Sequence, residues 1–310
     1  MENLSQKIFA PPLSEAERNL ILWGIKYEKK QDGSLHVPGD LEITSKDLIA
    51  LPDLSSVSVG GSVFCSVNRL TSLKGAPQSV GGSFHCSNNR LASLEGAPQS
   101  VGGSFYCSRS QLTSLVGAPQ SVGGNFVCDT NPLTSLEGAP QSVGASFSCA
   151  NSLLTSLEHA PQSVGRDFVC DGNRLTSLQG APQSIHGDFV CHANQLISLE
   201  GAPQFVGGNF RCRNNRLTSL AGAPQSVGRN FLCPGNQLVS LDLAPKKFQV
   251  LHSDFGKFKS WDEVPEDLRY SPETRARMEE QRIIAATVLQ APLKVDRPLK
   301  LNTFKPSSSP

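Results

Sequence analysis

Residues 70–90 read LTSLKGAPQSVGGSFHCSNNR, and variants of this stretch recur along the chain every 21 residues. A fixed period of this length means that one structural unit is copied, and a single copy cannot bury its apolar face alone. Copies must therefore stack, which predicts a linear repeat solenoid rather than one globular core. Later copies start at Leu91, Leu112, Leu133, Leu154, Leu175, Leu196, Leu217 and Leu238.

Within one copy, the stretch Ser83–Ser87 alternates polar and apolar residues. Such alternation is typical of a half-buried strand, with Phe84 and Cys86 facing inward and His85 facing outward. Because every copy repeats this stretch, the strands are expected to form one parallel β-sheet along the stack.

The rest of each copy carries turn signals. Gly81-Gly82 allows backbone angles that other residues avoid, so it is interpreted as the turn into the strand. Ala76-Pro77 indicates an extended return segment, since proline biases its neighbour toward extended conformations. Asn89 follows the strand, where its amide is expected to hydrogen-bond backbone groups of the bending chain.

The flanks differ from the repeat. Residues 37–43 match the strand half of a copy, with Leu41 and Ile43 in the apolar positions, and Ser14–Glu17 is a capping-box pattern that opens a helix. Ser271-Pro272 is expected to start a second helix that runs to about Leu289. We therefore predict a helical N-terminal cap (1–36), a solenoid (37–248), a helical C-terminal cap (249–290) and a disordered tail (291–310).

The nine cysteines all occupy the same position of the repeat. We expect each thiol to be a small buried hydrophobe in the core of the stack. Disulfide bonds are disfavoured because stacked strands, about 4.8 Å apart, leave the Cβ atoms too far apart, and the count is odd. A zinc site is disfavoured because a linear thiol row offers no tetrahedron. The positions are Cys65, Cys86, Cys107, Cys128, Cys149, Cys170, Cys191, Cys212 and Cys233.

The pattern Phe84-x-Cys86-x-x-Asn89-x-Leu91-x-x-Leu94 resembles a leucine-rich repeat, and the copy as a whole is similar to the short bacterial class found in secreted effectors of pathogens. It departs from that class in the cysteine, in Gly-Gly before the strand, and in one extra residue per copy. The resemblance covers about residues 37–248. It implies a curved leucine-rich-repeat-like stack with its parallel sheet on the concave face and short helical caps.

The resemblance also implies a protein-binding virulence effector, encoded by a bacterium or a phage, that is exported by a specialised secretion system into host cells. Ubiquitin ligases fused to similar repeats use a Cys-x-Asp loop in a C-terminal domain. Here Cys128-Asp129 and Cys170-Asp171 lack the intervening residue and lie inside repeats, and no cysteine follows Cys233. We therefore expect no enzymatic activity. Two alternatives stay open. In the first, the repeats recognise the substrate of an enzyme or of a ubiquitin-ligase-type adaptor whose activity or recruitment resides in residues 249–310. The second is a structural or surface solenoid.

The copies vary mainly at the two outward positions that flank each cysteine, which predicts a concave surface shaped for a partner protein. The alternative is neutral drift at tolerant exposed positions. The residues before the cysteines include a row of apolar side chains, larger than a soluble protein exposes without a function. The candidate partner-binding residues are Phe64, His85, Tyr106, Val127, Asp129, Val169, Asp171, Val190, His192, Arg211, Arg213 and Leu232.

Two charged groups lie on the later copies. Asp167, Asp171, Asp188 and His192 are expected to form an acidic patch, and Arg211, Arg213 and Arg216 a basic one. The alternative is that these charges pair across neighbouring strands, which contributes little to stability. A calcium site is disfavoured because no dense carboxylate loop is present.

Composition limits the classes of partner that the sequence predicts. The 310 residues carry 28 basic and 27 acidic side chains, so charge gives no reason to expect nucleic acid or an anionic membrane as partner. The apolar runs are too short to span a bilayer, and the first residues lack a general secretory signal. The sequence thus predicts a soluble protein of a reducing compartment, with no cofactor, no metal and no membrane insertion.

Overall fold

A computed structural model describes residues 12–290, and it divides into two compact units between Arg269 and Tyr270. In the second unit the structure describes the helix α3 (Pro272–Gln290), which begins where Ser271-Pro272 predicts it. The Ser271 hydroxyl accepts a hydrogen bond from the Thr274 backbone N–H at 3.1 Å, as an N-cap does.

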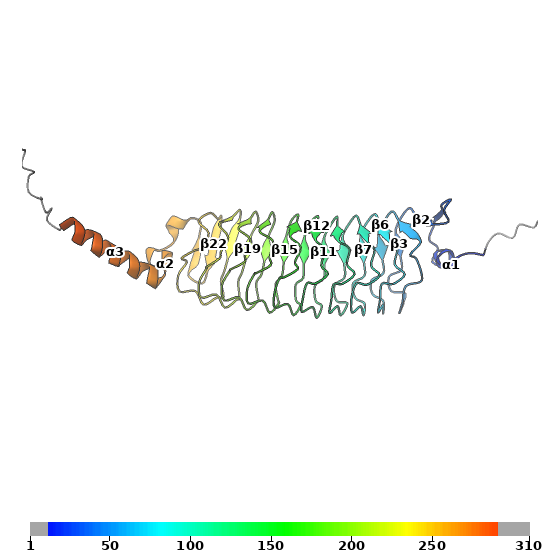
Figure 1. Ribbon diagram of the computed structural model, residues 1–310, viewed down its shortest axis with the longest axis horizontal. Coiled ribbons are helices and arrows are strands. Elements are labelled where there is room, and N and C mark those ends of the chain that lie inside the picture. The colour runs from blue at the N-terminus through cyan, green and yellow to red at the C-terminus, as the bar shows by residue number, and fades with distance from the viewer. Residues whose placement is uncertain (1–11, 291–310) are drawn as a thin grey trace, which may run out of the picture. The chain divides into compact units, whose positions relative to one another are not determined.

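The first unit is a stack of coils, and each coil contributes two very short parallel strands, one to each of two rows (Figure 1). The first row contains β2 (Leu35–Val37), β4 (Val57–Val59), β6 (Ser79–Val80), β8 (Ser100–Val101), β10 (Ser121–Val122), β12 (Ser142–Val143), β14 (Ser163–Val164), β16 (Ser184–Ile185), β18 (Phe205–Val206) and β20 (Ser226–Val227). The second row contains β3 (Leu41–Glu42), β5 (Val63–Phe64), β7 (Phe84–His85), β9 (Phe105–Tyr106), β11 (Phe126–Val127), β13 (Phe147–Ser148), β15 (Phe168–Val169), β17 (Phe189–Val190), β19 (Phe210–Arg211) and β21 (Asn230–Leu232).

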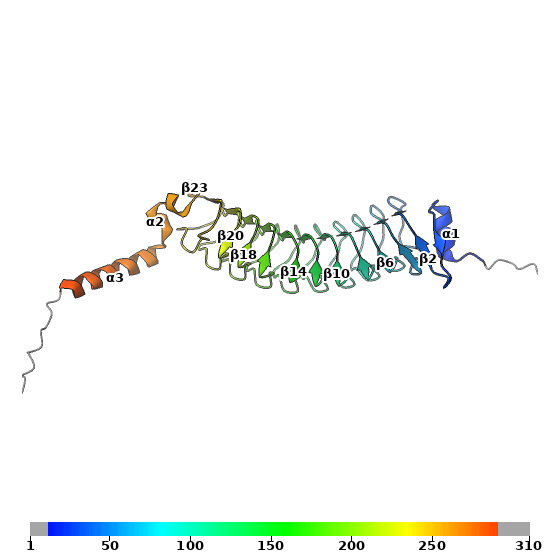
Figure 2. The same cartoon turned by 90° about the horizontal axis from the view of Figure 1, so that it is seen from above.

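The registers join equivalent residues of successive coils. Phe84 pairs with Phe105 and His85 with Tyr106, and the same register continues along the second row. The stack is curved, with the first row on the outer side of the bend and the second row on the concave side (Figure 2). The predicted curved solenoid with a parallel sheet on its concave face is therefore confirmed.

The core consists of columns of side chains, because each apolar residue of the repeat packs on the equivalent residue of the next coil. The phenylalanine rings from Phe84 to Phe231 are fully buried, with successive centroids 5.3 to 5.9 Å apart. The nine cysteines form a second buried column and are free thiols, as their inward position predicts. Burial raises the pKa of Cys65 to about 12.

The asparagine after the strand joins adjacent coils, as predicted. The Asn89 amide donates to the carbonyl oxygens of Cys65 in the preceding coil (3.1 Å) and Cys86 in its own coil (2.9 Å), and its oxygen accepts from the Leu70 N–H at 3.0 Å. Serine replaces this asparagine in two copies. Ser110 finds partners there, whereas the buried Ser152 hydroxyl has none within the described residues.

Two expectations about the coil need correction. The first is the single strand per copy: the Ser-Val pair before Gly-Gly forms the strands of the outer row, so the corner lies between two strands. The second is the reason for glycine at Gly81, which does not have a positive φ. A Cβ atom there would lie 2.3 Å from the carbonyl oxygen of Gly60, so close approach of neighbouring coils favours glycine at this corner.

At the N-terminal end, the helix α1 (Glu15–Leu22) covers the open core with Ala16 and Leu20. The predicted capping box is present, since Ser14 and Glu17 exchange side-chain-to-backbone hydrogen bonds. After the helix, β1 (Glu28–Lys29) pairs antiparallel with β2 and covers the edge of the outer row.

At the C-terminal end, the stack continues past residue 248, where the repeat signal ends. The strand β22 (Val250–Ser253) pairs parallel with β21, and β23 (Gly256–Phe258) pairs antiparallel with β22. A 3-10 turn (Trp261–Glu263) and the short helix α2 (Glu266–Arg269) follow. The segment 249–290 is thus not a purely helical cap, because Leu251 enters the core column and extends the concave sheet.

Candidate protein-binding face

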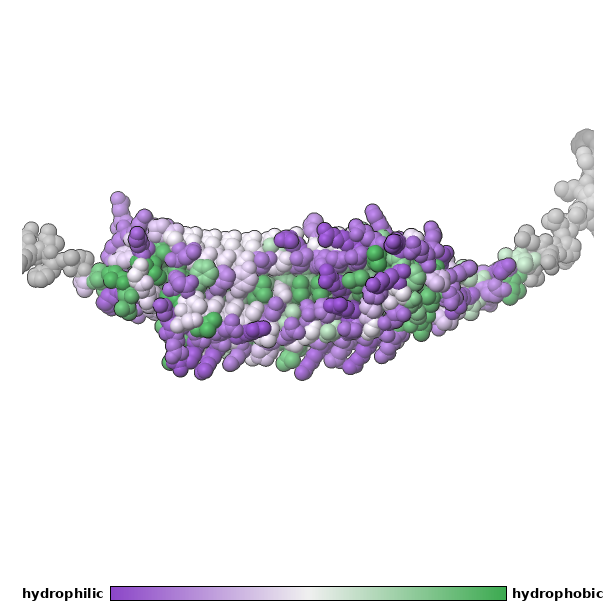
Figure 3. All heavy atoms as spheres, turned by 180° about the vertical axis from the view of Figure 1, so that it is seen from behind, coloured by the Kyte–Doolittle hydropathy of each residue, from purple (hydrophilic) through white to green (hydrophobic). Residues whose placement is uncertain are grey.

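The side chains that precede the cysteines form one row on the outward side of the concave sheet, which we call the concave row. Consecutive members are direct neighbours in the strand registers, and all are half-buried. Figure 3 shows a strip of apolar atoms over the middle coils, with hydrophilic atoms toward the C-terminal coils. The concave row consists of Phe64, His85, Tyr106, Val127, Ser148, Val169, Val190, Arg211 and Leu232.

The first three members of the concave row stack ring on ring. The centroids of Phe64 and His85 are 4.6 Å apart, and those of His85 and Tyr106 are 4.7 Å apart. Burial holds the pKa of His85 below its ordinary value, and the Glu42 carboxylate opposes this shift. Because the ring faces cover one another, this part of the face presents ring edges and the polar tips of His85 and Tyr106.

The middle of the concave row is aliphatic. Val169 and Val190 are paired across β15 and β17, and Val127 is separated from them by Ser148. The Ser148 hydroxyl donates to the Asp129 carboxylate at 2.6 Å, so its polar group is directed toward another side chain of the same face. A half-buried aliphatic surface of this kind loses further water-exposed area when a partner covers it.

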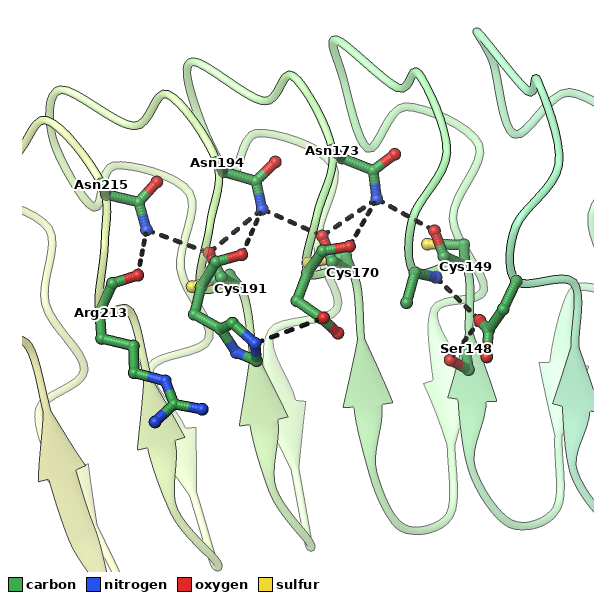
Figure 4. A network of polar contacts seen from close by, with 12 residues as sticks. Ser148, Cys149, Cys170, Asn173, Cys191, Asn194, Arg213 and Asn215 are labelled. Atoms are coloured by element: carbon green, nitrogen blue, oxygen red, sulfur yellow. Dashed lines mark hydrogen bonds and ion pairs between the residues drawn. The ribbon is translucent and has the colours of Figure 1, made fainter.

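The row after the cysteines holds Asp129, Asp171, His192 and Arg213. Figure 4 shows Arg213 of this row beside the cysteines and asparagines of adjacent coils. Asp129 accepts a second hydrogen bond from the Ala150 N–H at 2.8 Å, and burial nevertheless raises the pKa of its carboxyl. His192 Nε2 lies 3.4 Å from Asp171 Oδ2. Burial lowers the pKa of His192, Asp171 opposes this shift, and the nearby arginines reinforce it.

The expected acidic patch is not a surface of free charge. Asp188 accepts hydrogen bonds from the Asn209 N–H at 2.7 Å and forms an ion pair with Arg211 at 2.9 Å. Asp167 accepts from the Asp188 N–H at 2.8 Å. The pairing of charges across neighbouring strands, which sequence left as the alternative, therefore holds for Asp188 and Arg211.

Asp167 and Asp188 belong to a ladder of hydrogen bonds where the chain enters the strands of the concave sheet. The sequence analysis did not predict this ladder. From Asp40 to Asn209, the residue before Leu41, Val63 or the phenylalanine of a coil accepts a hydrogen bond from the backbone N–H of its equivalent in the next coil. The ladder runs through Asp40, Ser62, Ser83, Ser104, Asn125, Ser146, Asp167, Asp188, Asn209 and Asn230. The sequence does contain a signal for this ladder, because every residue at this position of the repeat has a side-chain oxygen.

The basic side chains are less engaged. Arg213 and Arg216 are exposed and form no ion pair within residues 12–290. Two buried nitrogens beside them, His192 Nδ1 and Arg211 Nε, have no hydrogen-bond partner in that part of the chain. The C-terminal coils of the face therefore offer the exposed guanidinium donors of Arg213 and Arg216 to a partner, whereas most of the carboxylates are already occupied.

The twelve candidate residues thus lie in two adjacent rows on one face. Among the described residues, no group of three or more His, Cys, Asp or Glu side chains is arranged to hold a metal ion. Within the same part of the chain, no helix is both long and apolar enough to cross a bilayer.

Neither a protein-family model nor a curated protein sequence matches the chain. Among solved structures, the chain is similar to YopM from Yersinia enterocolitica WA-314, with 20% identity, a TM-score of 0.38, and 79% of this chain aligned with 62% of that one. It is also similar to YopM of Yersinia pestis, a leucine-rich effector protein, with 15% identity, a TM-score of 0.36, and 69% of this chain aligned with 81% of that one. The chain thus spans less than two thirds of the first of these proteins, and at such low TM-scores the fold described above rests on this chain's own strands and registers.

Proposed function

We propose that the protein is a non-catalytic interaction module that binds a partner protein through its concave row and the row after the cysteines. The observation that carries this proposal is the variation among the copies at the two outward positions that flank each cysteine on one continuous sheet. The neighbouring core columns and the Ala-Pro returns are nearly uniform from copy to copy. The resemblance of the repeat to those of bacterial effectors extends the proposal to delivery into a host cell.

The composition of the face supports a protein partner. Tyr106 and Arg211 are residue types that act as anchors in protein interfaces, and the valines between them supply apolar area. Because Arg211 is already held by Asp188, its side chain needs little further ordering when a partner binds. Arg213, which forms no ion pair among the described residues, adds a positive charge at the same end, which suits an acidic group on the partner.

The test is quantitative capture of interacting protein by immobilised full-length protein. A variant with Tyr106→Ala, Val127→Ala and Arg211→Ala should lose capture while keeping its thermal stability within a few degrees. The matched control carries Ser100→Ala, Ser121→Ala and Phe205→Ala on the outer row of the same stack, and it should bind like the natural protein. Equal loss in both variants, or none in the first, rules out the concave face as the binding surface.

A further inference from the structure

The two rows of strands are capped differently at the N-terminal end. In the outer row, β1 pairs antiparallel with β2 and so covers its edge. In the concave sheet β3 is the last strand, and β5 is its only strand partner within residues 12–290. An uncovered strand edge presents unpaired backbone groups that another chain can join, so natural proteins usually cover it.

The backbone of β3 shows which groups are free. The N–H groups of Leu41 and Ile43 donate to the carbonyl oxygens of Ser62 and Phe64 at 2.8 Å. Alternate residues of a strand direct their backbone groups to opposite sides, so Glu42 directs its N–H and C=O away from β5. The next N–H on that side, from Thr44, is already bound by the Glu42 carboxylate at 2.8 Å.

A groove of about 630 Å³ lies along this edge. One wall is the segment Trp23–Lys26, which follows α1, and the other is the segment from Val37 to Asp40 with Glu42 and Lys46. The walls thus combine partly buried apolar side chains, Trp23 and Ile25, with exposed charges. A groove beside a free strand edge has the position that one further strand of the sheet would occupy.

The acidic and the basic side chains of the groove differ in the hydrogen bonds and ion pairs that they already form. The Asp40 carboxylate accepts the Ser62 N–H at 2.7 Å and the Glu42 carboxylate accepts the Thr44 N–H, so both acids are engaged with backbone donors. Lys26 and Lys46 are exposed and form no ion pair in the part of the chain that the structure describes. The two lysines are therefore the charged side chains of the groove that remain available to acidic groups of an occupant.

We propose that this edge binds an extended segment of a partner protein in which apolar and acidic residues alternate. The segment adds a strand to β3 through the Glu42 backbone groups. Its apolar side chains contact Trp23 and Ile25, and its carboxylates pair with Lys26 and Lys46. This site lies at the end of the sheet and is independent of the concave row, so each can fail without the other.

The probe is a labelled heptapeptide of alternating valine and glutamate, and its binding to the full chain is measured by fluorescence anisotropy. Glu42→Pro removes the outward N–H but leaves the Leu41 and Ile43 bonds to β5 intact, and proline is tolerated on the outer side of an edge strand. We expect Glu42→Pro to weaken binding about tenfold. The matched control Glu42→Ala loses the same carboxylate, which frees the Thr44 N–H, but keeps the Glu42 N–H, so it should bind at least as tightly as the natural protein.

Two further arms keep the test decisive if Glu42→Pro disturbs the cap. A peptide methylated on alternate amide nitrogens should bind the natural protein about tenfold more weakly than its unmethylated form. The double variant Lys26→Glu, Lys46→Glu should reverse the preference from the glutamate peptide to a valine–lysine peptide.

Equal binding of Glu42→Pro and Glu42→Ala, together with no effect of methylation, overturns the proposal. So does a concentration-dependent dimer in sedimentation velocity that Glu42→Pro abolishes, because a second copy would then occupy the edge. The concave triple variant should bind the peptide normally, and a loss there also contradicts the proposal, because the site would then not be independent of the concave row.

Discussion

The Asn173 side-chain amide donates a hydrogen bond to the Cys149 carbonyl oxygen of the preceding coil at 3.0 Å. The same amide reaches Cys170 at 3.1 Å, and its oxygen accepts the Leu154 N–H at 3.0 Å. One buried side chain thus holds the backbone of two coils where both leave the concave sheet. We expect Asn173→Ala to lower the free energy of unfolding by about 2–3 kcal/mol, because buried backbone groups lose their partners. Chemical denaturation followed by circular dichroism measures this, and the exposed Gln141→Ala is the control that should change little.

A substitution of Ser152 by asparagine should have the opposite effect on stability. Its buried hydroxyl has no partner within the described residues, while Asn173 in the next coil makes the full set of bonds. Ser152→Asn should raise the free energy of unfolding by about 1 kcal/mol by restoring the missing bonds. Ser110→Asn is the comparison, since Ser110 already donates to Cys86 at 3.2 Å and should gain less. A loss of stability in Ser152→Asn would show that the coil has no room for the amide.

Left-handed backbone angles predict a second stabilising change. Val67 has φ of 56° and is largely exposed, whereas Asn88 holds the equivalent place with the same φ. A β-branched residue is strained in this region, and asparagine tolerates it. Val67→Asn should raise the free energy of unfolding by about 1 kcal/mol, and Asn88→Val should lower it by a similar amount. Both are measured by thermal and chemical denaturation, and effects of the same sign in the two variants contradict the explanation.

The thiols should be inert in the folded protein. All nine are buried, and burial raises the pKa of Cys65 and of Cys233 to about 12, so the reactive thiolate is scarce at neutral pH. Titration with a chromogenic disulfide reagent should detect nine thiols in denaturant and almost none without it. Rapid reaction of several thiols in the native state would mean that the coils open locally far more often than their packing indicates.

Two aspartates should give opposite dependence of stability on pH. Burial alone raises the pKa of Asp188, but the hydrogen bonds from Asn209 and the charge of Arg211 outweigh it, so the pKa of Asp188 lies below its ordinary value. Its stabilisation is complete above the unfolded pKa and is lost as pH falls through the folded one. Burial raises the pKa of Asp129, so its ionisation destabilises the fold as pH rises through that value.

We therefore expect Asp188→Asn to be less stable than the natural protein at pH 7, by about 1 kcal/mol or less, and to approach it below about pH 4. Asp129→Asn keeps an oxygen for Ser148 and should be equally or more stable at pH 7, with the advantage lost in acid. Unfolding curves from pH 7 to 3 distinguish the two cases. Parallel curves for both variants would mean that neither carboxyl has a shifted pKa.

The sequence predicted the buried columns of side chains better than it predicted the corners of the coils. Phe84, Cys86 and Asn89 could be placed because a repeat period brings equivalent residues together whatever the details of the turn. The outer row was missed because a two-residue strand such as Ser79-Val80 is too short for alternation to be visible. The role of Gly81 was misread because a glycine kept for close approach and one kept for a positive φ look the same in a sequence.

The candidate face could be predicted as a set of positions but not as a set of free charges. The period shows that Asp188 and Arg211 lie on adjacent coils, whereas their pairing depends on side-chain geometry. The open edge at Glu42 was likewise invisible, because it depends on which strand the N-terminal cap covers.

The ladders of Asn173 and of the strand-entry residues join each coil to its immediate neighbours. Under a pulling force applied at the two ends of the stack, every coil boundary would carry the same tension and the boundaries would break one at a time. The coils would peel off singly, each releasing about 7 nm of chain from its 21 residues. Such a molecule yields in small steps and keeps its remaining coils folded while it lengthens.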